Sequence, residues 1–341
     1  MTAVATELNE AQLAAVTHGD GPLLVIAGAG SGKTRVLTRR IAFLLGERGV
    51  PASGILAFTF TNKAAREMTE RVHALVGPGA SAALWVGTFH ATCARLLRRE
   101  APRAGLPTAF SIFDRDDQLA LLKQAIKAND ISDDLKPGAI LSRISGAKNA
   151  FVDPEGYLRA ALGDLERRIA HVYAAYEEGL DKAGAVDFDD LIVRTARLLE
   201  NDEDVRGRYA GRFRHVLVDE YQDTNHAQFR LVAGFASVHG NVTAVGDDDQ
   251  SIYGWRGADL SNVLDFERRF PGAAVVRLEQ NYRSSGNILA AAAAVIEKNR
   301  ARKGKTLWTT RDAGMRLRLI LAGDEQAEGE RLAREALKQR E

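Results

Sequence analysis

Two short stretches of this sequence carry residue types that suit chemistry on a phosphate. The first is Ala27-Gly28-Ala29-Gly30-Ser31-Gly32-Lys33-Thr34, which follows the apolar run 23–26 and opens a segment with helix spacing. Glycines let the backbone curl so that its N–H groups point inward at a phosphate, and the helix N-terminus adds its positive dipole end. Lys33 can then reach the β- and γ-phosphates of a nucleotide, and the Thr34 hydroxyl can bind Mg²⁺. A glycine-rich turn with a surface lysine is the plainer alternative, which the flanking strand and helix disfavour.

The second stretch is Asp219-Glu220, directly after the apolar run 216–218. A carboxylate at the C-terminal end of a parallel strand is placed to hold Mg²⁺, and Glu220 is placed to orient or deprotonate a water that attacks the γ-phosphate. Alone, two such acids are explained equally well as a solvated strand cap. Together with the glycine-rich loop they predict a protein that hydrolyses ATP or GTP. Its catalytic residues are Lys33 and Glu220, and its Mg²⁺ ligands are Thr34, Asp219 and Glu220.

Alternating apolar strands and amphipathic helices must position these residues. We expect buried parallel strands at 23–26, 55–58, 84–86, 216–218, 242–245 and 275–278, and a helix over 34–45. From about residue 90 to about 190, helical spacing replaces the strands. The sequence therefore predicts an α/β fold in which residues 1–88 and 190–280 form one parallel sheet, with an inserted all-helical lobe at 89–189.

The last part of the chain has a different pattern. Residues 316–322 alternate in the manner of a strand, and a helical pattern runs from about residue 325 to residue 341. A lone strand and helix cannot bury an apolar face. We infer that the chain is a fragment, or that partner elements for this piece come from elsewhere.

Composition excludes several classes of protein and site. One cysteine among 341 residues rules out an internal disulfide framework and a cysteine-based zinc site, and it fits a reducing cytoplasm. No run reaches the roughly 18 apolar residues of a membrane helix, and no signal peptide is visible. The formal net charge of +1 gives no overall basic field. A nucleic-acid partner must therefore be held by a local groove.

Six strings resemble the motifs of superfamily 1 DNA helicases, and each is a weak signal alone. In chain order they are Leu8-Asn9-Glu10-Ala11-Gln12, Thr59-Phe60-Thr61-Asn62-Lys63-Ala64-Ala65, Gly87-Thr88-Phe89-His90-Ala91, Asp219-Glu220-Tyr221-Gln222-Asp223-Thr224-Asn225, Gly246-Asp247-Asp248-Asp249-Gln250-Ser251-Ile252-Tyr253-Gly254-Trp255-Arg256-Gly257-Ala258 and Gln280-Asn281-Tyr282-Arg283-Ser284-Ser285. Their order and spacing resemble those of the UvrD/PcrA/Rep family of bacterial 3′-to-5′ helicases over nearly the whole chain.

The resemblance implies further residues of an ATP site. Gln12 reads the adenine edge, Tyr282 stacks on the ring, and Arg35 contacts the nucleotide. Gln250 senses the γ-phosphate and couples it to DNA. Arg283 resembles the first arginine finger of the family, which places positive charge where the transition state gains negative charge. Spacing alone would favour a surface salt bridge for Arg283.

The resemblance also implies a surface for single-stranded DNA, in which aromatic faces hold bases and polar groups hold phosphates. The candidates are Phe60, Thr61, Asn62, Phe89, His90, Tyr253, Trp255 and Arg256. Burial in the core is an equally good explanation for Phe89, whereas the glycines and charges around Trp255 favour a loop. His90 has no second ligand at metal spacing. We expect Cys93 to be a buried hydrophobe and the acids of 187–190 to be helix caps.

What the resemblance implies as a whole is an ATP-dependent DNA helicase of the DNA-repair type, with ATP and Mg²⁺ as cofactors. Its partners are single-stranded DNA and 3′-tailed duplex DNA, without a membrane, in the cytoplasm. Residues 1–88 and 190–280 correspond to a RecA-like motor lobe, and 281–341 to the start of a second one. The fifth and sixth motifs, with a second arginine finger, are missing, so we expect this chain to bind both ligands, hydrolyse ATP poorly and not unwind DNA. Two alternatives stay open: a nucleotide-gated module that binds single-stranded DNA without unwinding, and the motor part of a helicase–nuclease subunit.

Overall fold

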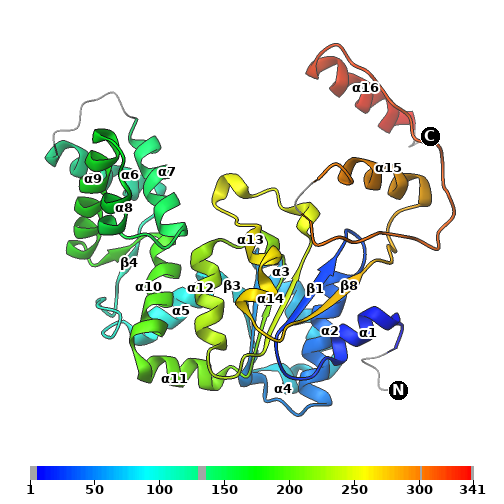
Figure 1. Cartoon of the computed structure of the whole chain (residues 1–341), viewed down its shortest axis with the longest axis horizontal. Helices are drawn as coiled ribbons and strands as arrows, with labels where there is room; N and C mark the ends of the chain where they lie inside the picture. The colour runs from blue at the N-terminus through cyan, green and yellow to red at the C-terminus, as the bar shows by residue number, and fades with distance from the viewer. Residues whose placement is uncertain (1–5, 130–135, 300–301, 339–341) are drawn as a thin grey trace.

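A six-stranded parallel sheet forms the centre of the computed structural model, which describes residues 6–129, 136–299 and 302–338 (Figure 1). The strand order is β3-β2-β6-β7-β1-β8. All six expected strands form, with every end within two residues of the prediction. They are β1 (Leu23–Ala27), β2 (Ile55–Thr59), β3 (Trp85–Thr88), β6 (His215–Val218), β7 (Val242–Gly246) and β8 (Ala274–Leu278). This confirms the predicted α/β fold with a RecA-like parallel sheet.

Helices cover both faces of the sheet. Successive side chains of a strand point to opposite faces, and here both sets are apolar, so each face needs a layer of helices to bury it. Leu24 and Ile26 of β1 belong to one core, and Leu23 and Val25 belong to the other. The second core contains α1 (Glu10–Thr17), α2 (Lys33–Gly46) and α3 (Asn62–Val76). The first contains α5 (Phe89–Glu100), α10 (Phe188–Asn201), α11 (Glu203–Arg212), α12 (His226–Ala236), α13 (Ser261–Leu264) and α14 (Phe266–Arg269).

The inserted helices form a separate lobe with its own apolar core, at the left of Figure 1. Its helices are α6 (Arg115–Ala128), α7 (Pro137–Asn149), α8 (Pro154–Ala160) and α9 (Asp164–Lys182). The chain enters and leaves this lobe through two short paired strands, β4 (Ser111–Ile112) and β5 (Ala185–Val186). The sequence placed α5 in the inserted lobe, and this was wrong: α5 packs in the core of the sheet, where Cys93 is buried as expected.

The C-terminal segment confirms the helix predicted from about residue 325 and contradicts the strand predicted at 316–322. The structure contains α15 (Gly286–Ile296) and α16 (Glu325–Lys338), and α16 lies away from the sheet with no buried residue (Figure 1). Residues 316–322 form no strand, although the sequence predicted one. Alternation of apolar side chains is not sufficient, because a strand also needs a neighbour for its backbone hydrogen bonds. The short α4 (Pro78–Ser81) completes the helices described, none of which is long and apolar enough to cross a membrane.

Arg40, a fully buried cation, fastens α1 to the sheet. Its guanidinium donates to the carbonyl oxygens of Ala15, Val16 and His18 at 3.2, 3.2 and 2.8 Å, and to the hydroxyl of Thr243 at 2.9 Å. Carbonyls at the end of a helix lack partners within it, so Arg40 caps them. The position of α1 matters because that helix carries Gln12.

We expect stability to depend on pH through His215, at the start of β6. Burial, and then the nearby charge of Arg40, lower the pKa of His215 to about 4. A base whose pKa is depressed in the folded state contributes stability above its ordinary pKa of 6.5, and this is lost as pH falls toward 4. Between these pH values, the unfolding free energy should fall by up to about 3 kcal/mol more in the wild type than in His215→Asn. Urea unfolding at several pH values measures this, and parallel pH profiles would contradict it.

Candidate functional site

The glycine-rich loop curls between β1 and the first residue of α2, Lys33. Gly30 and Gly32 have φ values of +71° and +96°, which side-chain-bearing residues rarely adopt. The Ser31 N–H and hydroxyl both donate to the Gly28 carbonyl oxygen, at 3.2 and 2.7 Å. This is the curled backbone at a helix N-terminus that the sequence predicted, and Thr34 is the second residue of α2.

The two acids after β6 lie beside this loop. The Glu220 carboxylate accepts a hydrogen bond from the Lys33 ammonium at 2.7 Å, and Glu220 itself has a left-handed φ of +49°. Asp219 is buried, and its burial together with the like charge of Glu220 raises its pKa to about 6. Lys33 and the two carboxylates therefore lie together at the carboxyl edge of the sheet, with Thr34 next to Lys33 in the chain. This donor set fits a Mg²⁺-bound triphosphate.

The α1 side of the loop is fixed by two amide side chains. Gln12 is buried, and its Nε2 donates to the Ser31 carbonyl oxygen at 2.9 Å. Asn9 caps α1 and donates to the Tyr282 hydroxyl oxygen at 2.9 Å. Asn9 was not among the predicted site residues, although Asn9 and Gln12 have the spacing of a capping box, which the structure contains. Arg35 forms an exposed ion pair with Glu7 at 2.7 Å.

The segment after β8 covers the loop from the other side. Asn281 donates from its side chain to the Ala29 carbonyl oxygen at 2.6 Å, and the Tyr282 N–H donates to that of Gly30 at 3.0 Å. A Cβ atom on Gly30 would lie 2.7 Å from Cβ of Arg283, so this approach also requires glycine. The Arg283 side chain is exposed and has no ion pair with another residue in the described ranges. It is therefore available to a ligand.

Gln250 is connected to Glu220 by a chain of hydrogen bonds that passes through the Gln222 side chain and through the backbone N–H and carboxylate of Asp247. Gln222 donates from Nε2 to the Glu220 carboxylate at 2.9 Å and accepts at Oε1 from the Asp247 N–H at 2.9 Å. The Asp247 carboxylate in turn accepts from the Gln250 side chain. A change at the Glu220 carboxylate therefore has a direct path to the loop that carries Tyr253 and Trp255.

A groove of about 820 Å³ separates the carboxyl edge of the sheet from the inserted helices. The Phe60 ring stacks on Tyr253 with centroids 5.2 Å apart, and Tyr253 lies 6.2 Å from Trp255. Trp255 is 78% exposed, as its glycine-rich surroundings suggested. Elsewhere along the groove, His90 meets the exposed ring of Phe188 edge to face at 5.9 Å. These rings offer faces for unpaired bases.

Most but not all of the residues predicted to contact DNA line this groove. Phe60, Thr61, His90, Tyr253 and Trp255 line the groove. Thr61 also caps α3, and exposed Asn62 begins that helix without lining the groove. The side chain of Arg256 lies outside the part of the chain that the structure describes.

Phe89 also lines the groove, but it is largely a core residue. It is 3% exposed and stacks on Phe58 of β2 with centroids 4.3 Å apart, so its ring face is occupied by the core and is not offered to a base. Phe188 and Arg115 line the groove and were missed. Phe188 stands among the acids of 187–190, and an aromatic side chain in so acidic a stretch was the available signal.

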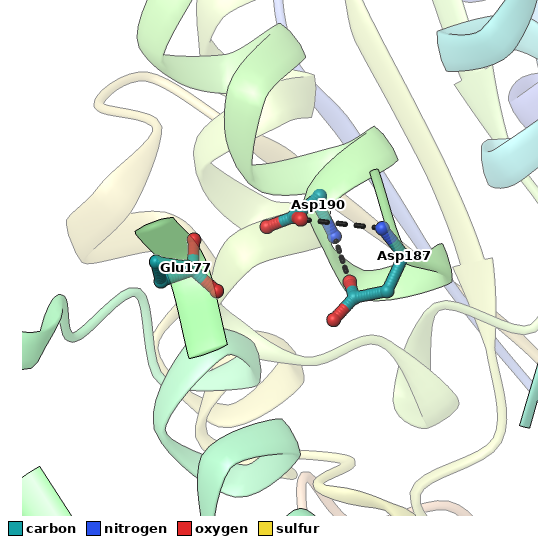
Figure 2. Close-up of side chains that lie close together, drawn as sticks. All are labelled: Glu177, Asp187 and Asp190. Atoms are coloured by element: carbon teal, nitrogen blue, oxygen red, sulfur yellow. Dashed lines mark hydrogen bonds between the residues drawn. The ribbon is translucent and has the colours of Figure 1, made fainter. Parts of the chain in front are cut away.

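Two groups of three acids are close enough to share a metal ion among the described residues, and a lysine occupies each. Figure 2 shows Glu177, Asp187 and Asp190, with the two hydrogen bonds by which the aspartates cap α10, as the sequence predicted. The Lys148 ammonium lies 2.6–2.8 Å from all three. The other group, Asp247 to Asp249, surrounds Lys305. The carboxylates of both groups are therefore already paired with a lysine ammonium.

Comparison with known proteins gives a consistent result over the whole chain. Residues 8–271 match the UvrD/REP helicase N-terminal domain, and residues 276–341 match the UvrD-like helicase C-terminal domain. The chain is 48% identical over 327 residues to a Bacillus subtilis protein named ATP-dependent DNA helicase PcrA, covering 96% of this chain and 44% of that protein. Identity is 46% to proteins of the same name from Staphylococcus aureus and Staphylococcus epidermidis, covering 99% of this chain and 46% of each. The chain thus spans less than half the length of these relatives.

Proposed function

Because this chain belongs to the UvrD/REP helicase family, we propose that it is the ATP- and DNA-binding part of an ATP-dependent DNA helicase. The observation that carries this proposal is the hydrogen-bonded path from Lys33 and Glu220 through Gln222 and Asp247 to Gln250. It connects a phosphate loop to an aromatic groove at the same edge of one sheet. A motor needs such a connection, whereas a simple nucleotide-binding protein does not.

At the nucleotide site, each residue has a role that its position supports. Lys33 leaves its ion pair with Glu220 to hold the β- and γ-phosphates, and the loop N–H groups cradle them. Thr34, Asp219 and Glu220 would hold Mg²⁺, which when bound neutralises phosphate charge. Glu220 then orients the attacking water and accepts its proton. Exposed Arg283 supplies positive charge on the opposite side.

At the base end of the nucleotide, Gln12 and Tyr282 provide recognition. Gln12 already bonds the loop carbonyl of Ser31, which fixes its amide beside the loop. The Tyr282 ring lies next to α1 through the hydrogen bond from Asn9, so it can stack on adenine. Arg35, at the third position of α2, contacts the nucleotide once it leaves Glu7.

The groove binds single-stranded DNA by stacking on its bases. The enzyme moves along that strand in the 3′-to-5′ direction and unwinds 3′-tailed duplexes. It does so in DNA repair, in the cytoplasm. Phe60, Tyr253 and Trp255 form one aromatic wall, while Phe188 and His90 lie elsewhere along the groove. Every base has a flat face, so such walls accept any sequence. Gln250 lies between this wall and the phosphate loop and reports the γ-phosphate to it.

Trp255→Ala tests the groove assignment. A stacked base contributes about 1–3 kcal/mol, so this variant should bind a fluorescent dT oligonucleotide about 5–150-fold more weakly by anisotropy. Trp308→Ala is the matched control, because Trp308 is also exposed and does not line the groove. Equal losses in the two variants, or none in Trp255→Ala, would contradict the assignment.

A further inference from the structure

A buried ion cluster lies next to the proposed nucleotide site. The Lys305 ammonium contacts the carboxylates of three consecutive residues, Asp247, Asp248 and Asp249, at distances between 2.5 and 2.7 Å. Burial alone lowers the pKa of Lys305, but hydrogen bonds to the three carboxylates outweigh burial and raise that pKa. The cluster of these four residues, the Lys305 clasp, is therefore held by charge-assisted bonds between side chains that are largely buried.

On one side, the clasp holds the loop that carries Gln250. The Gln250 side chain donates to the same Asp247 carboxylate that Lys305 contacts. Arg302 adds a second ion pair, to Asp249, at 2.8 Å. A shift of Lys305 would therefore move the acceptor to which Gln250 is bound.

On the other side, the clasp holds the segment 302–308, which lies against the phosphate loop. The Leu307 side chain packs so closely on Gly28 that a Cβ atom there would collide with it. The Trp308 carbonyl oxygen accepts from the Asn281 N–H at 2.7 Å, which extends the contact to the segment over Ala29. The clasp therefore connects the Gln250 loop to the segment 302–308, and Leu307 of that segment contacts the phosphate loop.

We propose that Lys305 is a positioning residue that holds Gln250 in place relative to the phosphate loop, and so transmits the nucleotide state to the DNA groove. The inference rests on the proposed function, since coupling requires that both ligands bind. Lys305 acts through Asp247 and Gln250 and touches neither ligand. Its loss leaves buried carboxylates without their common partner, so the Gln250 loop relaxes while the phosphate loop and the groove persist.

The test is the coupling between the two ligands rather than the affinity for either one. In the wild type, saturating dT oligonucleotide should change the affinity for a fluorescent, non-hydrolysable ATP analogue with Mg²⁺ by about 5–150-fold, the usual range of such coupling. Lys305→Met keeps the side-chain stem and removes the ammonium. In Lys305→Met we expect the oligonucleotide to change the affinity for the ATP analogue by less than about twofold. Each ligand alone should bind within about threefold of the wild-type affinity.

Two further variants isolate the role of the clasp. Lys303→Met makes the same change two residues away, where the ammonium pairs with Glu267 instead, and it should keep the coupling. Lys305→Met combined with Asp248→Asn restores the net charge without the lysine contacts, and it should stay uncoupled. Recovery of coupling in this double variant would show that net charge alone matters, which would overturn the inference.

Thermal unfolding by circular dichroism accompanies each titration. If Lys305→Met does not fold, the double variant, with one buried charge fewer, carries the test. Failure of both to fold would mean that the clasp is purely structural and would overturn the inference. If both ligands bind to the wild-type chain but neither changes the affinity for the other, both the proposed function and this inference are contradicted. If Lys305→Met keeps the wild-type coupling, only the inference is contradicted.

Discussion

Replacing Glu220 with glutamine is expected to slow ATP hydrolysis by about 10²–10⁴-fold, the range that a positioned general base contributes. The Glu220 carboxylate lies at the carboxyl edge of the sheet, fixed by Lys33 at 2.7 Å and Gln222 at 2.9 Å. A carboxamide keeps the shape of the side chain but cannot accept the proton of the attacking water. Single-turnover conversion of radiolabelled ATP, with the chain in excess, measures the change even where turnover is slow.

Nucleotide binding should respond in the opposite direction. Lys33 has an ion pair with Glu220 that a triphosphate must displace, so in the absence of Mg²⁺, where the metal-ligand role of Glu220 does not enter, Glu220→Gln should bind ATP as tightly as the wild type or more tightly. Asp223→Asn is the matched control, because Asp223 also accepts from Gln222 but forms no ion pair with Lys33. It should hydrolyse ATP at close to the wild-type rate. Wild-type hydrolysis by Glu220→Gln, or weaker binding of ATP without Mg²⁺, would remove Glu220 from the catalytic role.

The second large effect is expected on stability, from Lys148→Met. Lys148 lies on α7 of the inserted lobe, and its ammonium contacts Glu177 of α9 together with Asp187 and Asp190 at the start of α10. Figure 2 shows these three acids. Breaking a buried ion cluster by removing one partner typically costs about 3–5 kcal/mol, because the remaining charges stay buried and unpaired. Urea unfolding followed by circular dichroism should show this loss in free energy of unfolding.

A second lysine separates this effect from a general effect of losing charge. Lys182 lies on α9, exposed and paired with Glu178, and Lys182→Met should change the unfolding free energy by no more than about 0.5 kcal/mol. The junction between α7 and α10 also forms one wall of the groove, so Lys148→Met should weaken oligonucleotide binding as well. A Lys148→Met chain as stable as Lys182→Met would show that the cluster does not join the two lobes.

The sequence predicted the parts of the site that depend on local pattern. A buried strand, a glycine-rich turn and a helix start are all contiguous in the chain, so the loop at 28–32 and the position of Lys33 follow from a few neighbouring residues. Asp219 and Glu220 follow one strand in the same way. Because all parallel strands end at one edge of a sheet, these separate stretches meet without further information.

What depends on distant contacts could not be predicted. Phe89, the first residue of α5, is buried because it stacks on Phe58 of β2, and no local pattern distinguishes such a ring from an exposed one. The partners of Lys148 and Lys305 come from other elements, and their side chains resemble ordinary surface lysines in the sequence. The strand predicted at 316–322 was wrong because its apolar alternation is a local pattern, whereas a strand forms only where a neighbouring strand accepts and donates its backbone hydrogen bonds.

The most direct test of the account is whether nucleotide changes the affinity for DNA. The chain is titrated into a fluorescent dT oligonucleotide with Mg²⁺, with and without a saturating non-hydrolysable ATP analogue. The account predicts a change of at least about fivefold, absent in Lys33→Ala, because Lys33 and Glu220 connect through Gln222 and Asp247 to Gln250, whose loop continues to Tyr253 and Trp255. An affinity that the analogue leaves unchanged, although both ligands bind, would contradict the account.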